Sequence, residues 1–242
     1  MTGAASGIGR AVVTAFLREG ADVIAADVTY PSPSPEGDPR EQVVRLDISQ
    51  EDDWERLSER LRHLDVLVAC AGISAAKPIS ETSLKDWCSV MEVNLDGTFL
   101  SVKYGARLMH ESGGAIVVVG SVSGVKASAG ASAYCVSKAA VRMLVKTAAL
   151  ELKPQAIRVN CVSPGGVATP MWQKMPFWQE LVEKHGGEEG AWNALGGIDP
   201  AKSSIQRMAF PEEIASTIVF LSCDESTHIT GANIIVDGGH SL

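Results

Sequence analysis

SVSGVKASAGASAYCVSK, residues Ser121 to Lys138, places Tyr134 and Lys138 four positions apart. On a helix, such positions lie one turn apart on the same face, so a phenol and an ammonium can address one ligand. The positive charge favours the ionised phenol and so eases proton exchange at neutral pH. Ser121 follows the apolar run 115–119, so its hydroxyl is expected at the carboxyl end of a strand, where open α/β sheets bind ligands. Taken alone, the Y-x-x-x-K spacing more often marks a surface tyrosine and lysine on an ordinary helix.

The chain opens with a glycine-rich turn, MTGAASGIGR, in which Gly3, Gly7 and Gly9 precede an amphipathic helix expected over residues 8–19. Glycines let the backbone approach a pyrophosphate, and the start of a helix presents free N–H groups. The spacing is G-x-x-x-G-x-G rather than the commoner G-x-G-x-x-G, and such a turn alone is weak evidence for a nucleotide site.

Asp27 ends the next predicted strand, about 20 residues after the glycine turn, where a carboxylate can accept hydrogen bonds from the ribose hydroxyls of an adenosine. Ser6, which precedes the middle glycine, carries no charge. Ser6 and Asp27 therefore offer no basic pocket for a 2′-phosphate, and we predict NAD rather than NADP as the cofactor.

The composition suits one soluble α/β domain, with 242 residues of which 45% are hydrophobic. The net charge of −8 disfavours nucleic acid or an anionic membrane surface as a partner, since both would be repelled. The five cysteines are Cys70, Cys88, Cys135, Cys161 and Cys223. They are odd in number and not spaced as metal ligands. We therefore predict reduced thiols, a cytoplasmic protein and no metal site.

Strand and helix signals alternate along the chain. Strands are predicted at residues 21–27, 42–46, 65–69, 114–119, 156–162 and 233–236. Helices are predicted near residues 8–19, 50–63, 83–111, 132–153 and 211–222, and Ser49 and Ser83 resemble N-caps of two of them. This alternation predicts a doubly wound parallel (Rossmann) sheet with helices on both faces. No repeat or second domain is evident, so residues 1–242 are expected to form one dinucleotide-binding and catalytic domain.

Taken together, T-G-x-x-x-G-I-G, Ser121, Tyr134 and Lys138 resemble the short-chain dehydrogenase/reductase family. Further motifs in the right order carry the resemblance nearly to the C-terminus: Leu46-Asp47-Ile48, Val66–Gly72, Asn94 within MEVNLDGTF, Ser163–Pro170 and Ile229–Gly239. The family's strand signature N-N-A-G is altered here, because Ala69 and Cys70 replace both asparagines. We expect the side-chain bracing between strands to be weaker as a result.

The resemblance implies a catalytic tetrad of Asn94, Ser121, Tyr134 and Lys138. Tyr134 would be the general acid/base, Ser121 would bind the carbonyl oxygen, and Lys138 would hold the nicotinamide ribose. Asn94 would interrupt its helix and hold a water. The implied cofactor contacts are Gly3, Ser6, Gly7, Ile8, Gly9, Asp27, Asp47, Ile48, Ala71, Gly72, Tyr134, Lys138, Pro164, Gly165, Val167 and Thr169.

Residues 171–210 contain three of the five tryptophans: Trp172, Trp178 and Trp192. Aromatic residues at helical spacing more often belong to a core or a subunit interface. In the family, however, this region forms a lid over the substrate, and aromatic walls suit an apolar, alicyclic or aromatic substrate. Both readings remain open from the sequence.

These features predict an NAD-dependent oxidoreductase that interconverts a secondary alcohol and a ketone by hydride transfer. One alternative is a 3-oxoacyl-carrier-protein reductase-like enzyme, but such enzymes usually take NADPH and dock an acidic carrier, which Asp27 and the net charge of −8 disfavour. Another is a catalytically silent NAD-binding sensor, which the presence of all four tetrad positions disfavours. The family also implies a homotetramer built on helices 83–111 and 132–153, with positions such as Phe99, Val102 and Val141 exposed on an isolated subunit.

Two segments depart from the family pattern. Four prolines between Asp27 and residue 42 preclude a helix there, so a loop is predicted: Pro31, Pro33, Pro35 and Pro39. The buried strand that normally leads into Thr2-Gly3 has no counterpart, although its slot lies centrally between strands 21–27 and 65–69. We expect the native chain to begin upstream of Met1; otherwise the flanking strands should move together, or another segment should fill the slot.

Overall fold

The structure is a computed structural model that describes residues 1–30, 38–109, 111, 113–197 and 204–242. The strands are β1 (Val23–Asp27), β2 (Glu41–Arg45), β3 (Val66–Ala69), β4 (Gly114–Val119), β5 (Ile157–Pro164) and β6 (Asn233–Val236). The α-helices are α1 (Gly7–Arg18), α2 (Glu51–Ser58), α3 (Leu84–Met91), α4 (Gly97–Met109), α5 (Ser132–Leu152), α6 (Pro170–Gln173), α7 (Trp178–Lys184), α8 (Glu188–Ala194) and α9 (Pro211–Ser222). All the strand pairs are parallel, as the doubly wound fold predicts.

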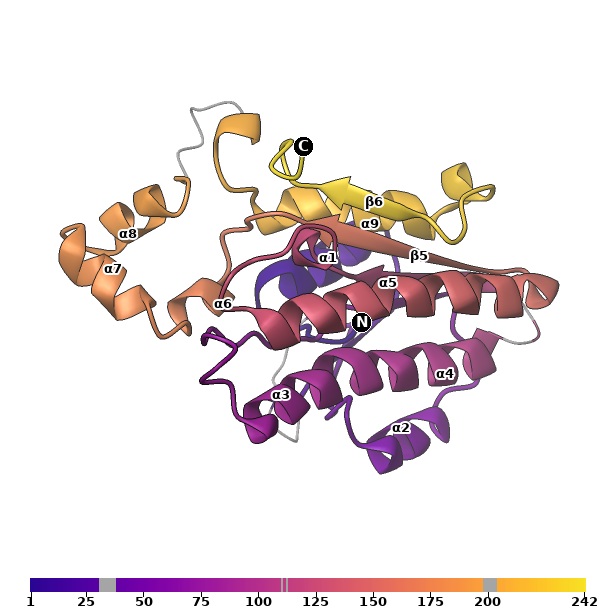
Figure 1. Ribbon diagram of the computed structural model, residues 1–242. Coiled ribbons are helices and arrows are strands. Elements are labelled where there is room, and N and C mark those ends of the chain that lie inside the picture. The colour runs from indigo at the N-terminus through magenta and orange to yellow at the C-terminus, as the bar shows by residue number, and fades with distance from the viewer. Residues whose placement is uncertain (31–37, 110, 112, 198–203) are drawn as a thin grey trace.

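Helices cover both faces of the sheet (Figure 1). α4 and α5 lie side by side on one face, and α1 and α9 pack together on the other. β4 shows why, since its run of apolar residues is buried on both sides. Ile116 and Val118 belong to the core cluster beneath α5, whereas Val117 and Val119 belong to the cluster beneath α9.

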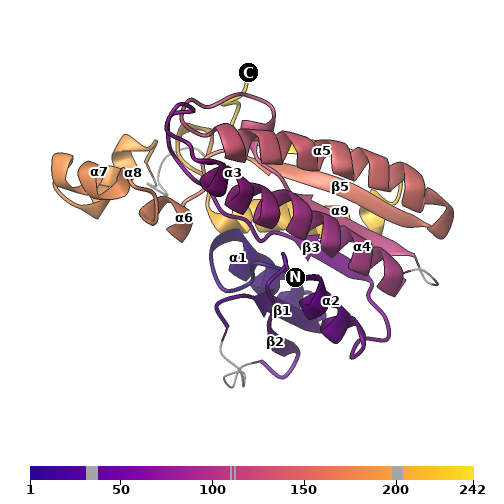
Figure 2. The same cartoon turned by 60° about the horizontal axis from the view of Figure 1, so that its bottom comes forward.

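The strands pair as β2 with β1 and as β3-β4-β5-β6, and Thr2 connects the two groups (Figure 2). Thr2 forms isolated parallel bridges with Ala26 of β1 and with Ala69 of β3. Its N–H donates to the Val68 carbonyl at 3.0 Å, and the Ala26 N–H donates to the Met1 carbonyl at 2.8 Å. We call this contact of Met1 and Thr2 with β1 and β3 the junction. At this level the flanking strands have not moved together, because Met1 and Thr2 lie between them.

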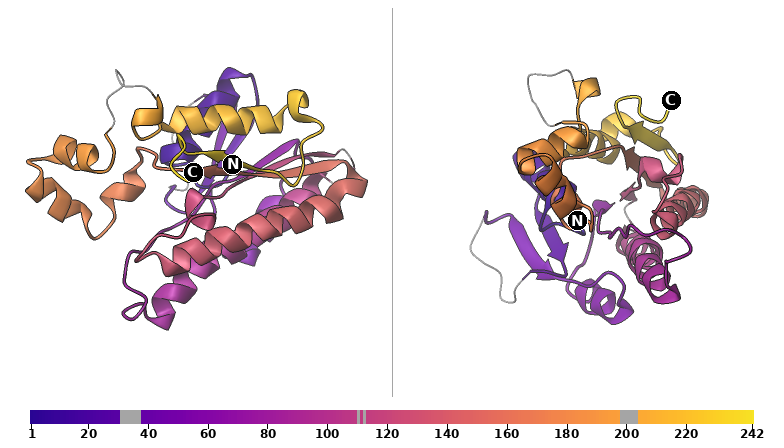
Figure 3. Two further views of the ribbon diagram at one scale, coloured as in Figure 1. Left: turned by 45° about the horizontal axis from the view of Figure 1, so that its top comes forward. Right: turned by 60° about the vertical axis from the view of Figure 1, so that its left-hand side comes forward.

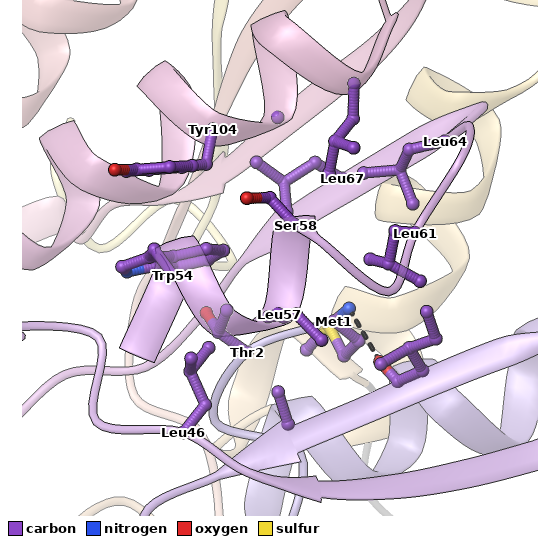
Figure 4. Close-up of a pocket in the computed structure, with 14 residues that line it drawn as sticks. Met1, Thr2, Leu46, Trp54, Leu57, Ser58, Leu61, Leu64, Leu67 and Tyr104 are labelled. Atoms are coloured by element: carbon purple, nitrogen blue, oxygen red, sulfur yellow. Dashed lines mark hydrogen bonds between the residues drawn. The ribbon is translucent and has the colours of Figure 1, made fainter. Parts of the chain in front are cut away.

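Beside the junction lies an apolar cavity of about 30 Å³ (Figure 4). It is lined by side chains of α2, α4, the two flanking strands and the segment between α2 and β3, among them Ile24, Trp54, Leu57, Leu61, Leu64 and Leu67. The Met1 ammonium donates to the Ile24 carbonyl at 3.0 Å. Burial lowers the pKa of this ammonium to about 6. Met1 and Thr2 thus occupy one end of the predicted strand slot, and the cavity occupies the space beside them.

Two of the predicted helices differ from the structure. The helix predicted over 83–111 is α3, a π-helical turn at Glu92–Asp96, and then α4, because the turn around Asn94 widens. Ser83 caps α3 as predicted, since its side chain accepts from the Asp86 N–H. The helix predicted over 50–63 ends at Ser58, and Ser49 is not its cap, because the Ser49 hydroxyl donates to Asp47 instead.

The predicted proline loop lies partly outside the described residues. Pro31, Pro33 and Pro35 lie outside the described residues, and Pro39 lies in a turn just before β2. α6, α7 and α8 follow β5 and extend beyond the edge of the sheet (Figure 3). Trp178 of α7 and Trp192 of α8 pack edge to face, with ring centres 4.9 Å apart, and this contact holds the two helices together.

Candidate active site

Ser121 lies just beyond the carboxyl end of β4, where the sequence predicted it. The chain turns there into a short 3₁₀ helix, Val122–Gly124, and Ser121 is its N-cap. The Ser121 Oγ accepts a hydrogen bond from the Ser123 N–H at 3.1 Å, and the residue is 8% exposed. Because the oxygen accepts this bond, its own proton remains available for another acceptor.

Tyr134 and Lys138 share one face of the first two turns of α5. The Lys138 Nζ lies 5.8 Å from the centre of the Tyr134 ring and donates to the Val119 carbonyl at 2.9 Å. Lys138 is only 4% exposed. A buried ammonium is costly without compensating contacts. Its place beside the phenol therefore matches the predicted pairing of a proton donor with a fixed positive charge.

Asn94 is fully buried in the π-helical turn between α3 and α4. Its Oδ1 accepts from the Ile73 N–H at 2.8 Å, and its Nδ2 donates to the Ile73 carbonyl at 2.9 Å. A Cβ added to Gly72 would lie 3.2 Å from this Oδ1 and 3.5 Å from the Lys138 Nζ. Asn94 and Lys138 therefore meet at Gly72, and the predicted interruption of the helix is confirmed.

The turn after Ser121 is fastened to α5. A Cβ added to Gly124 would lie 2.7 Å from the Lys138 carbonyl oxygen, so only a glycine allows this approach. The Arg142 guanidinium donates to the Gly124 carbonyl at 2.7 Å. These contacts bring Ser121 to the helix that carries Tyr134 and Lys138.

The glycine turn fits a dinucleotide phosphate. Gly3 has φ 67°, and a Cβ there would lie 2.8 Å from the Ala71 Cα. A Cβ on Gly9 would lie 1.8 Å from the Gly3 carbonyl oxygen, so the turn folds tightly upon itself. Ser6 is the exposed N-cap of α1 and makes no capping bond with its side chain, and Ile8 packs into the core. The open start of α1 can therefore receive a phosphate on its backbone N–H groups.

The two predicted adenosine contacts lie at the carboxyl ends of the smaller group: Asp27 is the last residue of β1, and Asp47 lies two residues after β2. The Asp27 Oδ2 accepts from the Ala5 N–H at 3.1 Å, which ties the end of β1 to the glycine turn. The Asp47 Oδ1 accepts from the Ser49 N–H at 3.0 Å. Ile48 is buried, and a Cβ on Gly97 would lie 2.7 Å from its Cδ1. These residues therefore lie near the carboxyl ends of β1 and β2.

The loop from Pro164 to Thr169 approaches the same place. The Gly165 N–H donates to the Val236 carbonyl at 2.9 Å, and Val167 is 5% exposed in a parallel bridge with Ala209. A Cβ added to Gly7 would lie 3.1 Å from the Thr169 Cγ2. The predicted nicotinamide loop therefore borders the predicted phosphate turn.

The hydroxyl groups of Thr2 and Ser137 were not predicted from the sequence to belong to the site. The Thr2 Oγ1 accepts from the N–H groups of Cys70 (3.2 Å) and Ala71 (3.3 Å), so it braces the strand end where the family's asparagines are replaced. The Ser137 Oγ contacts Asn94 and the Tyr134 carbonyl. Their only sequence signals are their places beside Gly3 and Lys138. Burial raises the pKa of the Cys70 thiol to about 11, so this thiol stays protonated.

None of the helices within the described part of the chain has both the length and the apolar character needed to cross a membrane. Across the same residues, no group of three or more His, Cys, Asp or Glu side chains is placed to hold a metal ion.

A family model described as Enoyl-(Acyl carrier protein) reductase matches residues 3–241. The chain is 38% identical over 259 residues to the (3R)-3-hydroxyacyl-CoA dehydrogenase of Mus musculus, which covers 99% of this chain and 94% of that protein. The chain belongs to the short-chain dehydrogenase/reductase family. This short-chain dehydrogenase/reductase is therefore an oxidoreductase of hydroxyl or keto groups that uses a nicotinamide cofactor.

Two further similarities support the family assignment. The short-chain dehydrogenase/reductase is 36% identical over 252 residues to the Cis-4-hydroxycyclohexanecarboxylate dehydrogenase of Sinomonas cyclohexanicum, over 100% of this chain and 95% of that protein. A solved structure of the Thermoplasma acidophilum aldohexose dehydrogenase in ligand-free form superposes with a TM-score of 0.85 and 31% identity, and the match covers 99% of this chain and 92% of that one.

Proposed function

We propose that the enzyme interconverts a secondary alcohol and a ketone, with NAD as the hydride carrier and a small apolar, alicyclic or aromatic molecule as the substrate. The observation that carries this proposal is the place of Lys138, one turn after Tyr134 on α5, against the turn that follows Ser121 and near Asn94 at Gly72. These residue types suit alcohol oxidation, and Gly72 follows Ala71, which lies against the glycine turn proposed to bind the dinucleotide.

The proposed chemistry assigns one task to each residue. Bound nicotinamide supplies hydride transfer. In the oxidation direction, the Tyr134 hydroxyl takes the alcohol proton, and the Lys138 ammonium stabilises the resulting phenolate and holds the ribose. The Ser121 hydroxyl donates to the substrate oxygen, where negative charge develops. Asn94 completes the tetrad and holds a water that connects Lys138 to solvent.

The preference for NAD rests on Asp27. Its carboxylate faces the glycine turn through the bond from Ala5, and Ser6 beside it is uncharged. A 2′-phosphate at that place would meet a negative charge near partly buried backbone, which is unfavourable. The two ribose hydroxyls of NAD would instead donate to this carboxylate.

The proposed substrate class rests on the segment 171–210, which we propose as a lid on a single domain that spans residues 1–242. Trp172 and Phe177 lie with ring centres 6.4 Å apart, and the Trp172 Nε1 donates to the Val167 carbonyl, next to the proposed nicotinamide loop. Aromatic groups anchored there favour an apolar ring. The Sinomonas relative is named for a substrate with such a ring.

One other function has specific support, and a second alternative does not. A hydroxyacyl or oxoacyl thioester substrate is favoured by the description of the matched family and by the name of the mouse relative. The net charge of −8 disfavours docking of an acidic carrier protein. A catalytically silent NAD sensor is disfavoured because all four tetrad residues are present and Lys138 contacts both the turn after Ser121 and Gly72, where Asn94 also lies.

The proposal includes a cytoplasmic homotetramer, based on family resemblance. The exposed surface differs from the sequence expectation, because Val102 and Val141 are 5% and 0% exposed and face the core. Phe99 is 48% exposed, as predicted, and the outer face of α5 adds Met143 (62%) and Leu150 (77%). These side chains would be covered by a second copy. Light scattering at micromolar concentration tests this, and a monomer would contradict it.

A substrate panel tests the proposed function. Cyclic and aromatic secondary alcohols, aldohexoses and 3-hydroxyacyl thioesters are each offered with NAD and with NADP, and cofactor reduction is followed by the absorbance of the reduced nicotinamide. We expect the highest kcat/KM for an alicyclic alcohol with NAD. Preference for the thioester would favour the acyl alternative, and binding of NADH without any turnover would favour the sensor.

A further inference from the structure

Ser137 is a fully buried hydroxyl that the proposed proton path does not use. It lies directly before Lys138 on α5. Its Oγ donates to the Tyr134 carbonyl oxygen at 2.8 Å and accepts from the Asn94 Nδ2 at 3.1 Å, from a residue 43 positions away in the chain. One hydroxyl thus joins the backbone of the proposed acid/base residue to the side chain of another tetrad member.

The donor and acceptor roles in this series of hydrogen bonds can be assigned in only one way. A serine hydroxyl has one proton, and the Tyr134 carbonyl can only accept, so the Ser137 Oγ must accept from the Asn94 amide. The Ile73 backbone requires the same orientation, because its N–H faces Oδ1 and its carbonyl faces Nδ2. Both hydrogens of the Asn94 amide are therefore used, one on Ile73 and one on Ser137. Removing the Ser137 hydroxyl would leave one of them buried without an acceptor.

These hydrogen bonds also fix the position of α5 relative to the other elements of the site. Asn94 holds the backbone of Ile73, which follows Gly72, where Asn94 and Lys138 meet. Further along α5, Arg142 fastens the helix to the turn that follows Ser121. Ser137 therefore supplies the polar contact of the first turns of α5 with the Asn94 side.

We propose that Ser137 is a positioning residue, which fixes the first turns of α5 against the π-helical turn and thereby sets where the Tyr134 phenol and the Lys138 ammonium stand relative to the substrate. The proposal rests on the proposed function of Tyr134 and Lys138. Ser137 itself touches neither substrate nor cofactor in this account.

The first test compares S137A with a matched control, S101A. Ser101 on α4 is also fully buried, but its Oγ donates to the Gly97 carbonyl at 2.7 Å, so this hydrogen bond stays within α4. In S137A we expect kcat to fall about tenfold, the KM for NAD to change less than about twofold, and the pH–rate profile to move to higher pH. We expect S101A to leave all three unchanged. An S137A kcat within about twofold of wild type, or an equal loss in S101A, would overturn the proposal.

The second test does not depend on activity. Amide hydrogen exchange at Ile73 is measured in the cofactor-free protein, because Asn94 protects this N–H. We expect about tenfold faster exchange in S137A and unchanged exchange in S101A. Unchanged exchange in S137A would overturn the proposal whatever the activity. Faster exchange in a protein whose wild type reduces no cofactor would support the positioning role and reject the proposed function. If S137A does not fold, S137C, with a weak donor of similar size, replaces it under the same criteria.

Discussion

The sheet has a larger group of strands, β3 to β6, and a smaller pair, β1 and β2, and the two are held differently. Each strand of the larger group pairs with its neighbour over at least four residues, and α5 and α4 cover one face of this group. The smaller pair joins it through the junction at Thr2. The proposed catalytic tetrad lies on the larger group and its helices, whereas the proposed adenosine contacts lie at the carboxyl ends of β1 and β2.

This difference suggests that chemistry and cofactor selection occupy separately supported parts of the molecule. Substitutions in the larger group should change turnover, those after the smaller pair should change cofactor binding, and those at the junction should change stability.

The largest effect is expected for Tyr134→Phe, which removes only the phenolic hydroxyl and with it the group that exchanges the proton. We expect kcat to fall by about 10²–10⁴-fold, the usual share of acid/base catalysis, while NADH binding stays nearly intact. Steady-state rates and an NADH fluorescence titration measure the two quantities. A variant that keeps more than about a hundredth of the wild-type kcat would show that Tyr134 is not the acid/base residue.

The next effect is expected for Asp27→Ala, at the end of β1. Loss of a charged acceptor for two ribose hydroxyls should weaken NAD binding by about 10–100-fold, with kcat at saturation little changed. The double variant Asp27→Ala, Ser6→Arg should shift the preference toward NADP.

Asp38→Ala serves as the control for Asp27→Ala, since Asp38 is a carboxylate near the start of β2 that pairs with Arg40. Its removal should not affect the cofactor. Equal kcat/KM for NAD and NADP in the wild type would contradict the role given to Asp27.

A smaller effect is expected at the junction. Thr2→Val keeps the shape of the side chain but removes the acceptor for the Cys70 and Ala71 N–H groups, which should lower the free energy of unfolding by about 1–3 kcal/mol. Thr14→Val is the control, because the Thr14 hydroxyl donates only to a carbonyl of its own helix. Urea unfolding measures both variants. Similar losses would mean that the junction contributes nothing special.

The smallest effect is expected outside both groups, at the start of α9. Hydrogen bonds from Arg207 lower the pKa of Glu213, so the pair stabilises the fold at neutral pH, and this contribution is lost as the pH falls through the lowered value. Because Glu213 is partly exposed, Glu213→Gln should cost less than about 1 kcal/mol at pH 7. The difference from wild type should shrink below about pH 4. Glu212→Gln, at the exposed neighbour, should show no such pH dependence.

The order of elements could be predicted because apolar runs such as 115–119 mark buried strands, and the six strands begin and end within about two residues of their predicted bounds. The end of α2 could not. Leu61 and Leu64 continue its apolar pattern, but they line the cavity beside the junction instead. Where these two leucines pack depends on residues far away in the sequence, such as Met1 and Ile24, which a local pattern does not include.

The residues of the candidate site also divide into those that local sequence predicts and those that it does not. Residues joined by local spacing, such as Tyr134 and Lys138, were predictable. Thr2 was not, because its partner Cys70 is 68 positions away. The exposure of Val102 and Val141 was predicted wrongly, since an apolar residue on a long helix can face either the sheet or a partner. Only the rotation of the helix against the sheet decides between the two.

The cavity beside the junction has a consequence for the response to hydrostatic pressure. Pressure favours the state of smaller volume, and unfolding removes internal voids. The space of about 30 Å³ corresponds to about 18 mL/mol, and the part of it that excludes water would add to the volume lost on unfolding. Because this space borders the contact that joins β1 to β3, compression would act first on the attachment of the smaller pair, and the strands of the proposed adenosine contacts should yield before those of the proposed tetrad.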